Sequence, residues 1–471
     1  MRKPSRLVIV VAVIVLGAMG SIVAVRAAGP PPPTPDAPCH PGDRPEALQG
    51  RVPAADYSTG RAALGYNCNA GEVSHIADSG GYRTYRYVDR HGRVCAFFDS
   101  TLLFPANAIT APPSQTGVWV MNMSDPTHPV HTDTLRTPAM QTPHESMSLN
   151  VRRGLLGAVA ANPVFYPGQF DLYDVSEDCR YPTLDASFPS GILGHEGSFS
   201  PDGNTYYSAS LFGHTIAAID VSNPRLPTTI WISLNWVIHG LNVSDNGKTL
   251  YAADVGSGTK GLLVLDVSQV QARVPHPNVV QIAHLTWPEV STPQTNLPVT
   301  IKGHRYLVED DEFGAGGGSG PVGAARIIDI SDAAHPKVVS NLRLAVNDTP
   351  TDPKLLADPG ANSTLQGYAA HYCGVPSEVD PGIVACSFIV SGLRVFDIRD
   401  PSHPKEIAYF NRPQTQSVTP GGAPRGAYAM SQPAFDKATG DIWYTDGNSG
   451  FYVVHINSPP GRSGKRRHRN P

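Results

Sequence analysis

The segment Gly392–Pro404, GLRVFDIRDPSHP, decides the fold because variants of it recur along the chain. Each copy has a glycine, a short apolar run, a position that is usually aspartate, and a turn that ends in proline. The copies begin at Gly117, Gly168, Gly213, Gly261, Gly323, Gly392 and Gly450. The aspartate position falls at Asn122, Asp174, Asp220, Asp266, Asp329, Asp397 and His455, so successive copies lie 46 to 68 residues apart. A repeat at this period indicates an array of similar structural units.

Further strand-like runs flank each copy. Two short apolar runs joined by a polar turn come before it, as in SFSPDGNTYYSAS from Ser198 to Ser210. Asp-Gly and Asn-Gly turns between such runs are typical of β-hairpins. One more run follows, as in KEIAYF from Lys405 to Phe410. Each unit is therefore predicted to be a four-stranded antiparallel sheet, and the whole to be an all-β, seven-bladed β-propeller.

The closure of the ring can also be predicted. Residues 72–78 (EVSHIAD) resemble the outer strand of a unit but precede the first complete unit, whereas the last unit, near Ile456, lacks an outer strand. We therefore expect residues 72–78 to complete the seventh blade.

The N-terminus is typical of export. Arg2, Lys3 and Arg6 precede an apolar run from Leu7 to Val25, so residues 1–28 are predicted to be a signal peptide or a signal-anchor helix. Residues 29–65 are predicted to form a Pro-rich linker, residues 66–459 the propeller, and residues 460–471 a basic disordered tail. We expect a secreted or membrane-anchored protein whose propeller lies outside the cytoplasm and whose N-terminal segment contacts the membrane.

Composition supports a folded β-rich body. The chain of 471 residues has 45 Gly, 45 Pro and 41% hydrophobic residues, which is typical of a turn-dense globular protein rather than of disorder. Its formal net charge of −4 gives no reason to expect nucleic acid as a partner.

Six cysteines in an exported chain indicate disulfides. Cys373 and Cys386 lie symmetrically about the turn Asp380-Pro381-Gly382, so a hairpin would place them opposite each other. We predict that they are bonded. Cys39, Cys68, Cys95 and Cys179 allow three pairings, and the sequence does not select among them.

Histidines open the innermost strand in several units. They are His144, His195, His239 and His371, and two of them are followed by a carboxylate, Glu145 and Glu196. The equivalent positions in blades one, five and seven are predicted near Thr84, Thr295 or Asn296, and Gln432. Because the starts of inner strands meet at one face of the channel, these side chains could form a ring that binds copper, zinc or iron. Alternatively, the histidines serve only as structural hydrogen-bond partners between blades.

A second candidate site is acidic. Glu309, Asp310, Asp311 and Glu312 precede the glycine-rich segment 314–320, and carboxylates before such a loop could hold Ca²⁺. The spacing does not match an EF-hand, and acidic loops are commonly just solvated.

The segments GLRVFDIRDPSHPKEI and GLLVLDVS resemble LVIVD repeats, and the resemblance covers roughly residues 66–457. It implies a propeller fold but no particular chemistry. The strand-opening histidines resemble, more distantly, those of the selenium-binding protein and methanethiol oxidase propellers. That second resemblance implies copper.

Two functions are therefore open. The first is a non-catalytic exported or cell-surface scaffold that binds a protein or small-molecule partner at the channel mouth. The second is a metal-dependent oxidoreductase, with copper favoured, built on the histidine ring. No HExxH or GxSxG motif is present to indicate a hydrolase, and whether the chain is an enzyme stays open.

Overall fold

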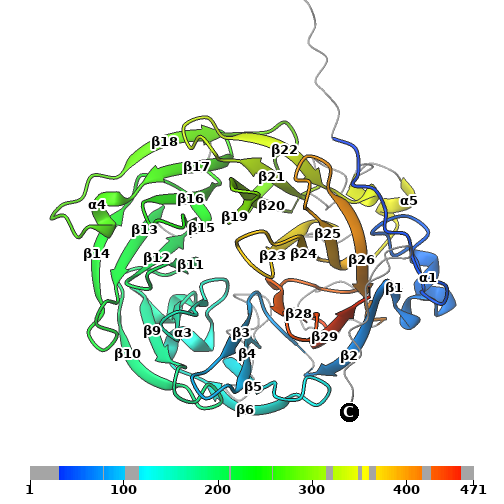
Figure 1. Cartoon of the computed structure of the whole chain (residues 1–471), viewed down its shortest axis with the longest axis horizontal. Helices are drawn as coiled ribbons and strands as arrows, with labels where there is room; N and C mark the ends of the chain where they lie inside the picture. The colour runs from blue at the N-terminus through cyan, green and yellow to red at the C-terminus, as the bar shows by residue number, and fades with distance from the viewer. Residues whose placement is uncertain are drawn as a thin grey trace, which may run out of the picture.

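Seven antiparallel β-sheets surround a central channel (Figure 1). The structure is a computed structural model that describes residues 31–77, 79–100, 116–211, 214–256, 258–313, 322–347, 353–359, 367–415 and 426–457. Each sheet is one blade, with its first strand at the channel and its last at the rim. Six blades have four strands and one has five, which confirms the predicted seven-bladed propeller.

The strands follow the sequence repeat. Blade one contains β3 (Thr84–Val88), β4 (Val94–Asp99), β5 (Val118–Asn122) and β6 (Val130–Leu135). Blade two contains β7 (Ser148–Asn150), β8 (Leu155–Val159), β9 (Gln169–Asp174) and β10 (Thr183–Pro189). Blade three contains β11 (Glu196–Phe199), β12 (Thr205–Ser210), β13 (Thr215–Asp220) and β14 (Thr228–Ser233). Blade four contains β15 (Ile238–Val243), β16 (Thr249–Asp254), β17 (Gly261–Asp266) and β18 (Val280–Leu285).

The remaining blades have the same order. Blade five contains β19 (Thr292–Ile301), β20 (His304–Glu312), β21 (Ala325–Asp329) and β22 (Lys337–Leu342). Blade six contains β23 (Ala370–Gly374), β24 (Ile383–Phe388), β25 (Gly392–Asp397) and β26 (Lys405–Asn411), with β1 (Tyr66–Cys68) added outside β26. Blade seven contains β27 (Ala434–Asp436), β28 (Asp441–Asp446) and β29 (Gly450–Ile456). The short α-helices among the described residues are α1 (Ala54–Thr59), α3 (Pro138–Gln141), α4 (Ser268–Gln271) and α5 (Pro353–Leu356).

A strand from the N-terminal part closes the ring. β2 (Ala70–Ile76) pairs antiparallel with β29, and Gly71 lies opposite His455. The predicted closure is confirmed, although the strand covers residues 70–76 and Asp78 lies outside the described residues. Pairing the edge of the last blade removes an exposed strand edge.

The glycine and the aspartate of the repeat each meet a local structural requirement. In blades four and six, the glycine that opens the third strand lies against a carbonyl near the end of the fourth strand. A Cβ at Gly261 would lie 2.0 Å from the Leu285 oxygen, and at Gly392 it would lie 2.5 Å from the Phe410 oxygen. The aspartate that ends the third strand accepts a hydrogen bond from the backbone two residues later, as Asp220 does from Ser222 at 2.8 Å. This bond forms the Asx-turn that leads into the fourth strand.

The apolar core lies between the blades. Tyr207 and Ile216 of blade three share one buried cluster with Leu241, Leu250 and Leu263 of blade four. Each blade therefore packs on its neighbours rather than around a core of its own, and the stability of one blade depends on the next.

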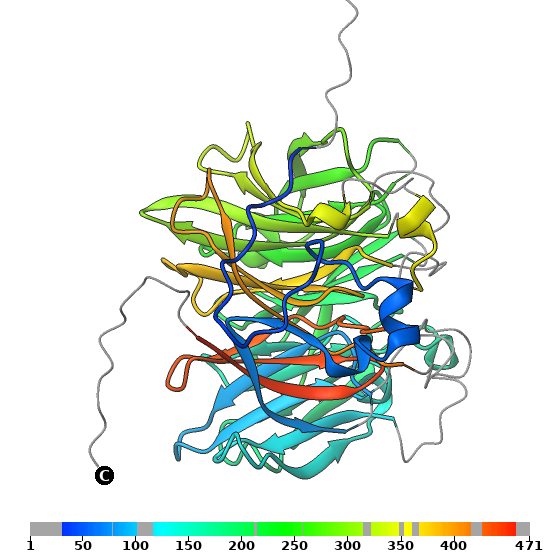
Figure 2. The same ribbon diagram turned by 90° about the vertical axis from the view of Figure 1, so that its right-hand side faces the viewer.

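Residues 31–65, within the predicted linker, lie along the outer side of the ring (Figure 2). The backbone of Thr34 donates to the Arg343 oxygen at 2.8 Å, and Val52 and Ala62 are fully buried. The domain boundaries stay predictions, but this segment is part of the folded body. The predicted segments 1–28 and 460–471 lie outside the described residues. Among the residues that are described, no helix is long and apolar enough to cross a membrane.

Three disulfides are present. Cys373 and Cys386 face each other across β23 and β24 with their Cα atoms 4.0 Å apart, as the hairpin predicted. The other bridges join Cys39 to Cys68 and Cys95 to Cys179. The first of these holds the N-terminal segment next to blade six, and the second links blades one and two. Three disulfides favour a location outside the cytoplasm.

Candidate metal centre

The four predicted histidines meet at the channel, at the starts of the inner strands. His195 and His239 approach each other at 2.9 Å between their Nε2 atoms. The ring of His144 lies against that of His195, with centroids 4.5 Å apart. His371 reaches the same cluster from blade six through its Nε2 atom, 3.2 Å from the Glu145 Oε1 atom. All four side chains are largely buried, and His144 and His195 keep 8% and 9% of their surface exposed.

Glu145 lies at the centre of this cluster. Its Oε2 atom is 3.2 Å from the His195 Nε2 atom and 3.7 Å from the His239 Nδ1 atom. Its Oε1 atom faces His371 and, at 4.0 Å, the His144 Nε2 atom. The backbone of His144 has a φ of +51°, an uncommon conformation for a residue with a side chain. Such conformations concentrate at functional sites.

Glu312 is a member of this cluster that the sequence placed elsewhere. Its Oε1 atom lies 3.0 Å from the His239 Nε2 atom, and its Oε2 atom lies 3.5 Å from the His371 Nε2 atom. The sequence had grouped it with Glu309, Asp310 and Asp311 as a calcium loop. Glu312 therefore joins a site that also contains nitrogen donors.

The calcium interpretation needs correction because these four residues lie on a buried strand, β20, and not in a loop. Side chains alternate along a strand. Glu309 and Asp311 form ion pairs with buried Arg326. The charges nearest Asp310 include His371, and Glu312 contacts His371 directly. The four carboxylates thus divide into two pairs with different partners.

Glu196, which was predicted beside the histidines, also has partners outside the histidine cluster. Its Oε1 atom accepts from Thr295 at 2.9 Å and from the Leu241 backbone at 3.2 Å, and it pairs with the Arg83 guanidinium at 2.8 Å. Its Oε2 atom accepts from the Tyr372 hydroxyl at 2.9 Å. The Arg83 guanidinium also lies 4.1 Å from the centre of the Tyr372 ring. With Arg83 and Tyr372, Glu196 forms a layer below the histidines that we call the floor. Its carboxylate also lies within 4.8 Å of donor atoms of Glu145 and His239, so its role as a metal ligand stays a prediction.

The ring positions of the other blades differ from the predicted ones. Blade one contributes Tyr82 instead of Thr84, and the Tyr82 ring lies 4.4 Å from that of His144. Blade five contributes Gln294 instead of Thr295 or Asn296, with its Nε2 atom 3.4 Å from the His371 Nε2 atom. Gln432 of blade seven lies one layer lower, beside Arg83, with which it shares a β-bridge. In blade five, a bulge between Pro293 and Thr295 shifts the register, which explains why simple counting missed Gln294.

Charge in the cluster is balanced by protons. Burial opposes a charge on His371 and His239, but the neighbouring Glu145 and Glu312 outweigh it and raise the pKa of both histidines. Conversely, the histidines lower the pKa of Glu145 and Glu312 against the effect of burial. Burial lowers the pKa of His144 to about 3, so this imidazole is neutral. The buried His/Glu cluster has the donor types that could hold a metal.

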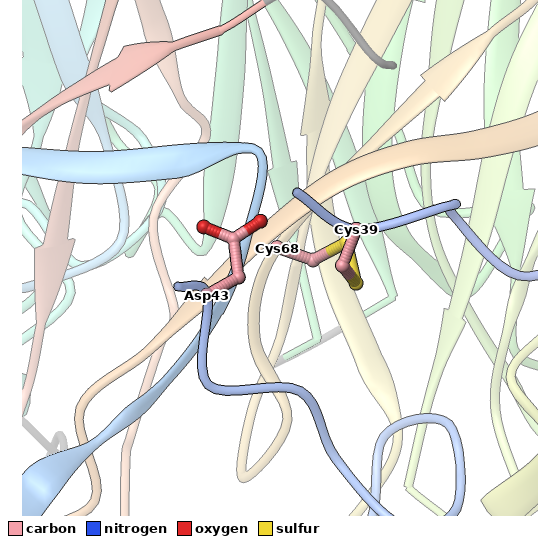
Figure 3. Close-up of side chains that lie close together, drawn as sticks. All are labelled: Cys39, Asp43 and Cys68. Carbon is pink, nitrogen blue, oxygen red and sulfur yellow. A yellow bond between two sulfur atoms is a disulfide. The ribbon is translucent and has the colours of Figure 1, made fainter. Parts of the chain in front are cut away.

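A second group with metal-binding residue types lies on the outer side of the ring. It consists of Cys39, Asp43 and Cys68 (Figure 3). The two sulfur atoms form a disulfide, so they are not available as thiolate ligands. The Asp43 carboxylate instead accepts from the backbones of His40 and Asn69 at 2.9 and 2.8 Å. This group is structural.

A cavity of about 380 Å³ occupies the channel beyond the floor. Its lining includes Ser148, Ser198 and Asn242, which follow the clustered histidines of the same three blades by three or four residues. At about 3.3 Å per residue, these side chains lie about 10 Å further along the channel. Arg83 also lines this cavity, so one layer of side chains separates it from the histidines.

Comparisons with known proteins show the fold alone. No family profile and no curated protein matches the chain. The chain is similar to the Cps50 (Swd1) β-propeller domain of Myceliophteria thermophila, with a TM-score of 0.51 and 11% identity over 82% of this chain and 98% of that one. It is also similar to the periplasmic gluconolactonase PpgL of Pseudomonas aeruginosa, with a TM-score of 0.47 and 14% identity over 73% and 93%. A third similar structure is the hydrazine synthase of Kuenenia stuttgartiensis, with a TM-score of 0.48 and 12% identity over 81% of this chain and 97% of that one. The chain is thus a seven-bladed β-propeller, a fold commonly used as a binding scaffold, and membership of the LVIVD-repeat family is not shown.

Proposed function

We propose that this protein is a metal-dependent oxidoreductase with a transition-metal centre in its channel. The observation that supports it is the convergence of four histidines and two carboxylates, from blades two to six, in which each member has a neighbouring member at 2.9 to 4.0 Å. Four imidazoles give the centre affinity for copper, iron or zinc, and two carboxylates supply the charge that a divalent cation needs. Copper or iron would supply one-electron chemistry. The partly exposed edges of His144 and His195 would face the substrate.

Metal analysis tests this proposal. The disulfide-bonded full chain is dialysed against Cu²⁺, Fe²⁺ or Zn²⁺, and the bound metal is measured by mass spectrometry. At least one ion per chain should remain, and the double variant His195→Ala/His239→Ala should lose it. The matched control is His335→Ala, which removes an exposed turn histidine that contacts only Asp332 among the described residues. A wild-type protein that retains no ion, or a double variant that retains as much, would contradict the proposal.

The assignment of Glu196 to the floor makes the test sharper. Glu196→Gln preserves an acceptor for Thr295 and a partner for Tyr372, so it should keep the metal. Glu145→Gln removes a carboxylate that faces the histidines directly, and it should lower affinity at least tenfold. Equal losses in both variants would mean that Glu196 is a ligand after all.

The cavity below the floor supports a second candidate function, that of a scaffold for a small-molecule or protein partner. Hydroxyl and amide groups of Ser148, Ser198 and Asn242 line it, and its volume suits a small organic molecule. Native mass spectrometry of the purified chain tests this. A co-purified molecule that is lost in Asn242→Trp but kept in the histidine double variant would favour the scaffold over the enzyme.

We infer that the propeller works outside the cytoplasm, either secreted or held at a membrane by residues 1–28. The three disulfides support this location. Protease added to intact cells should digest a membrane-held propeller, and a secreted propeller should be found in the medium. Protection of the folded chain inside the cytoplasm would contradict the inference. Nucleic acid is not among the proposed partners.

A further inference from the structure

Glu145 and Glu312 each direct their two carboxylate oxygens to different histidines. Glu145 presents Oε1 to His371 and His144, and Oε2 to His195 and His239. Glu312 presents Oε2 to His371 and Oε1 to His239. Both carboxylates therefore span the same two groups of histidines, which divides the cluster into two halves.

The first half contains the Nε2 atoms of His195 and His239, with Glu145 Oε2 and Glu312 Oε1. Neighbouring donors in it are separated by 2.9 Å (His195–His239), 3.0 Å (His239–Glu312) and 3.2 Å (His195–Glu145). Ligands that share one metal ion at bonds of about 2.0–2.2 Å lie about 3.0–3.5 Å apart. Each of these three neighbouring pairs has a spacing that a shared ion would allow.

The second half contains the Nε2 atoms of His371 and His144, with Glu145 Oε1 and Glu312 Oε2. His371 lies 3.2 Å from Glu145 and 3.5 Å from Glu312, again within the range for a shared ion. His144 lies 4.0 Å from the Glu145 Oε1 atom, on the same side of this carboxylate as His371. The remaining nitrogen of His371 bonds the Met430 carbonyl at 2.6 Å, which fixes the ring with Nε2 toward the carboxylates.

A second cation in one buried cluster requires more negative charge nearby. Asp310 lies two residues before Glu312 on β20 and is fully buried. Both of its oxygens lack a hydrogen-bond partner among the described residues, and His371 is among its nearest charges. A buried carboxylate without partners is costly unless something compensates it. A cation bound at His371 would do so.

We propose that the centre is dinuclear, with two transition-metal ions bridged by Glu145 and Glu312, one bound by His195 and His239 and the other by His371 and His144. This inference rests on the proposed function, since it requires a metal centre at these residues. Two ions bridged by carboxylates lie about 3.5–4 Å apart, a spacing at which both can act on one bound molecule.

The experiment counts ions. The full chain is freed of metal, dialysed against Zn²⁺ at increasing concentration, and analysed for metal per chain. Two ions are expected in the wild type and one in Glu312→Gln, whose amide oxygen can bind one ion but no longer bridges two. His284→Gln, which removes a histidine that is 20% exposed and paired with Asp254, controls for adventitious surface binding and should keep two ions. Circular dichroism and the melting temperature establish that each variant is folded.

The outcomes separate the two proposals. One ion in the wild type overturns the dinuclear centre and leaves the proposed function standing, whereas no ion overturns both. Two ions in Glu312→Gln would refute the bridging role. X-ray absorption on the protein loaded with Cu²⁺ should show a metal–metal distance of about 3.5–4 Å, and its absence in a protein with two ions would place the second ion elsewhere.

Discussion

Removing the Arg83 guanidinium should destabilise the propeller through the charge it leaves behind on Glu196. Arg83 and Glu196 keep 4% and 0% of their surface exposed, and their ion pair of 2.8 Å lies in the middle of the channel. Arg83→Met fills most of the same volume without the charge. Glu196 would then be a buried carboxylate without a cationic partner.

The magnitude follows from what remains around Glu196. Breaking a buried ion pair by removing one partner costs about 3–5 kcal/mol. Thr295, Tyr372 and the Leu241 backbone still donate to this carboxylate, so we expect the lower end, about 3 kcal/mol. The double variant Arg83→Met/Glu196→Gln removes the unpaired charge and should recover about 2 kcal/mol of that loss.

Urea unfolding of the wild type, both single variants and the double variant measures these differences as a thermodynamic cycle. Arg83 also donates to the Glu145 carbonyl and contacts Gln432, and both contacts are lost equally in Arg83→Met and in the double variant. Their difference therefore reports the charge on Glu196. If the double variant is no more stable than Arg83→Met, the floor is held by packing and our electrostatic reasoning is wrong.

Three further outcomes follow from the fold, each measured by chemical unfolding. Replacing Cys95 and Cys179 by Ala should cost about 1.5 kcal/mol more than replacing Cys373 and Cys386, because the first bridge spans 84 residues and the second 13. Gly261→Ala should cost more than 2 kcal/mol, since its Cβ would lie 2.0 Å from the Leu285 carbonyl oxygen, whereas the control Gly303→Ala, with open space around it, should cost about 1 kcal/mol. Burial raises the pKa of Asp446 to about 6, so the folded state holds its proton more tightly than the unfolded state. The resulting stabilisation is present below about pH 4 and is lost as pH rises to 6. Asp446→Asn should therefore remove about 2–3 kcal/mol from the fall in the free energy of unfolding between these pH values.

Each of these outcomes can fail. Equal costs for the two disulfides would mean that the unfolded chain is not a flexible polymer. Equal costs for Gly261→Ala and Gly303→Ala would show that the repeat glycine is not required by the outer strand. A pH profile of stability that is unchanged in Asp446→Asn would place the titrating group elsewhere.

The fold could be predicted from the sequence because the repeated residues are required by local backbone contacts and turns. Gly261 and Asp220 occur where a strand must approach a carbonyl or enter a turn, and similar contacts recur in other blades. The unpaired outer strand before the first blade then settled the closure of the ring.

The site was predicted only in part because it depends on register. His195 and His239 could be found by their position at strand starts. Glu312 could not, since it ends a second strand, and only the alternation along β20 directs it into the channel. Glu196 looked equivalent to Glu145 in sequence, yet it forms an ion pair with Arg83 from another blade. Such partners are distant along the chain, and no local pattern reports them.

The most direct test of a metal centre in the channel is an anomalous-diffraction map of the metal-loaded protein. Our account predicts anomalous density enclosed by His144, His195, His239 and His371 and in contact with Glu145 and Glu312. Density that appears only at surface histidines, with the channel cluster held together by its protons alone, would contradict it.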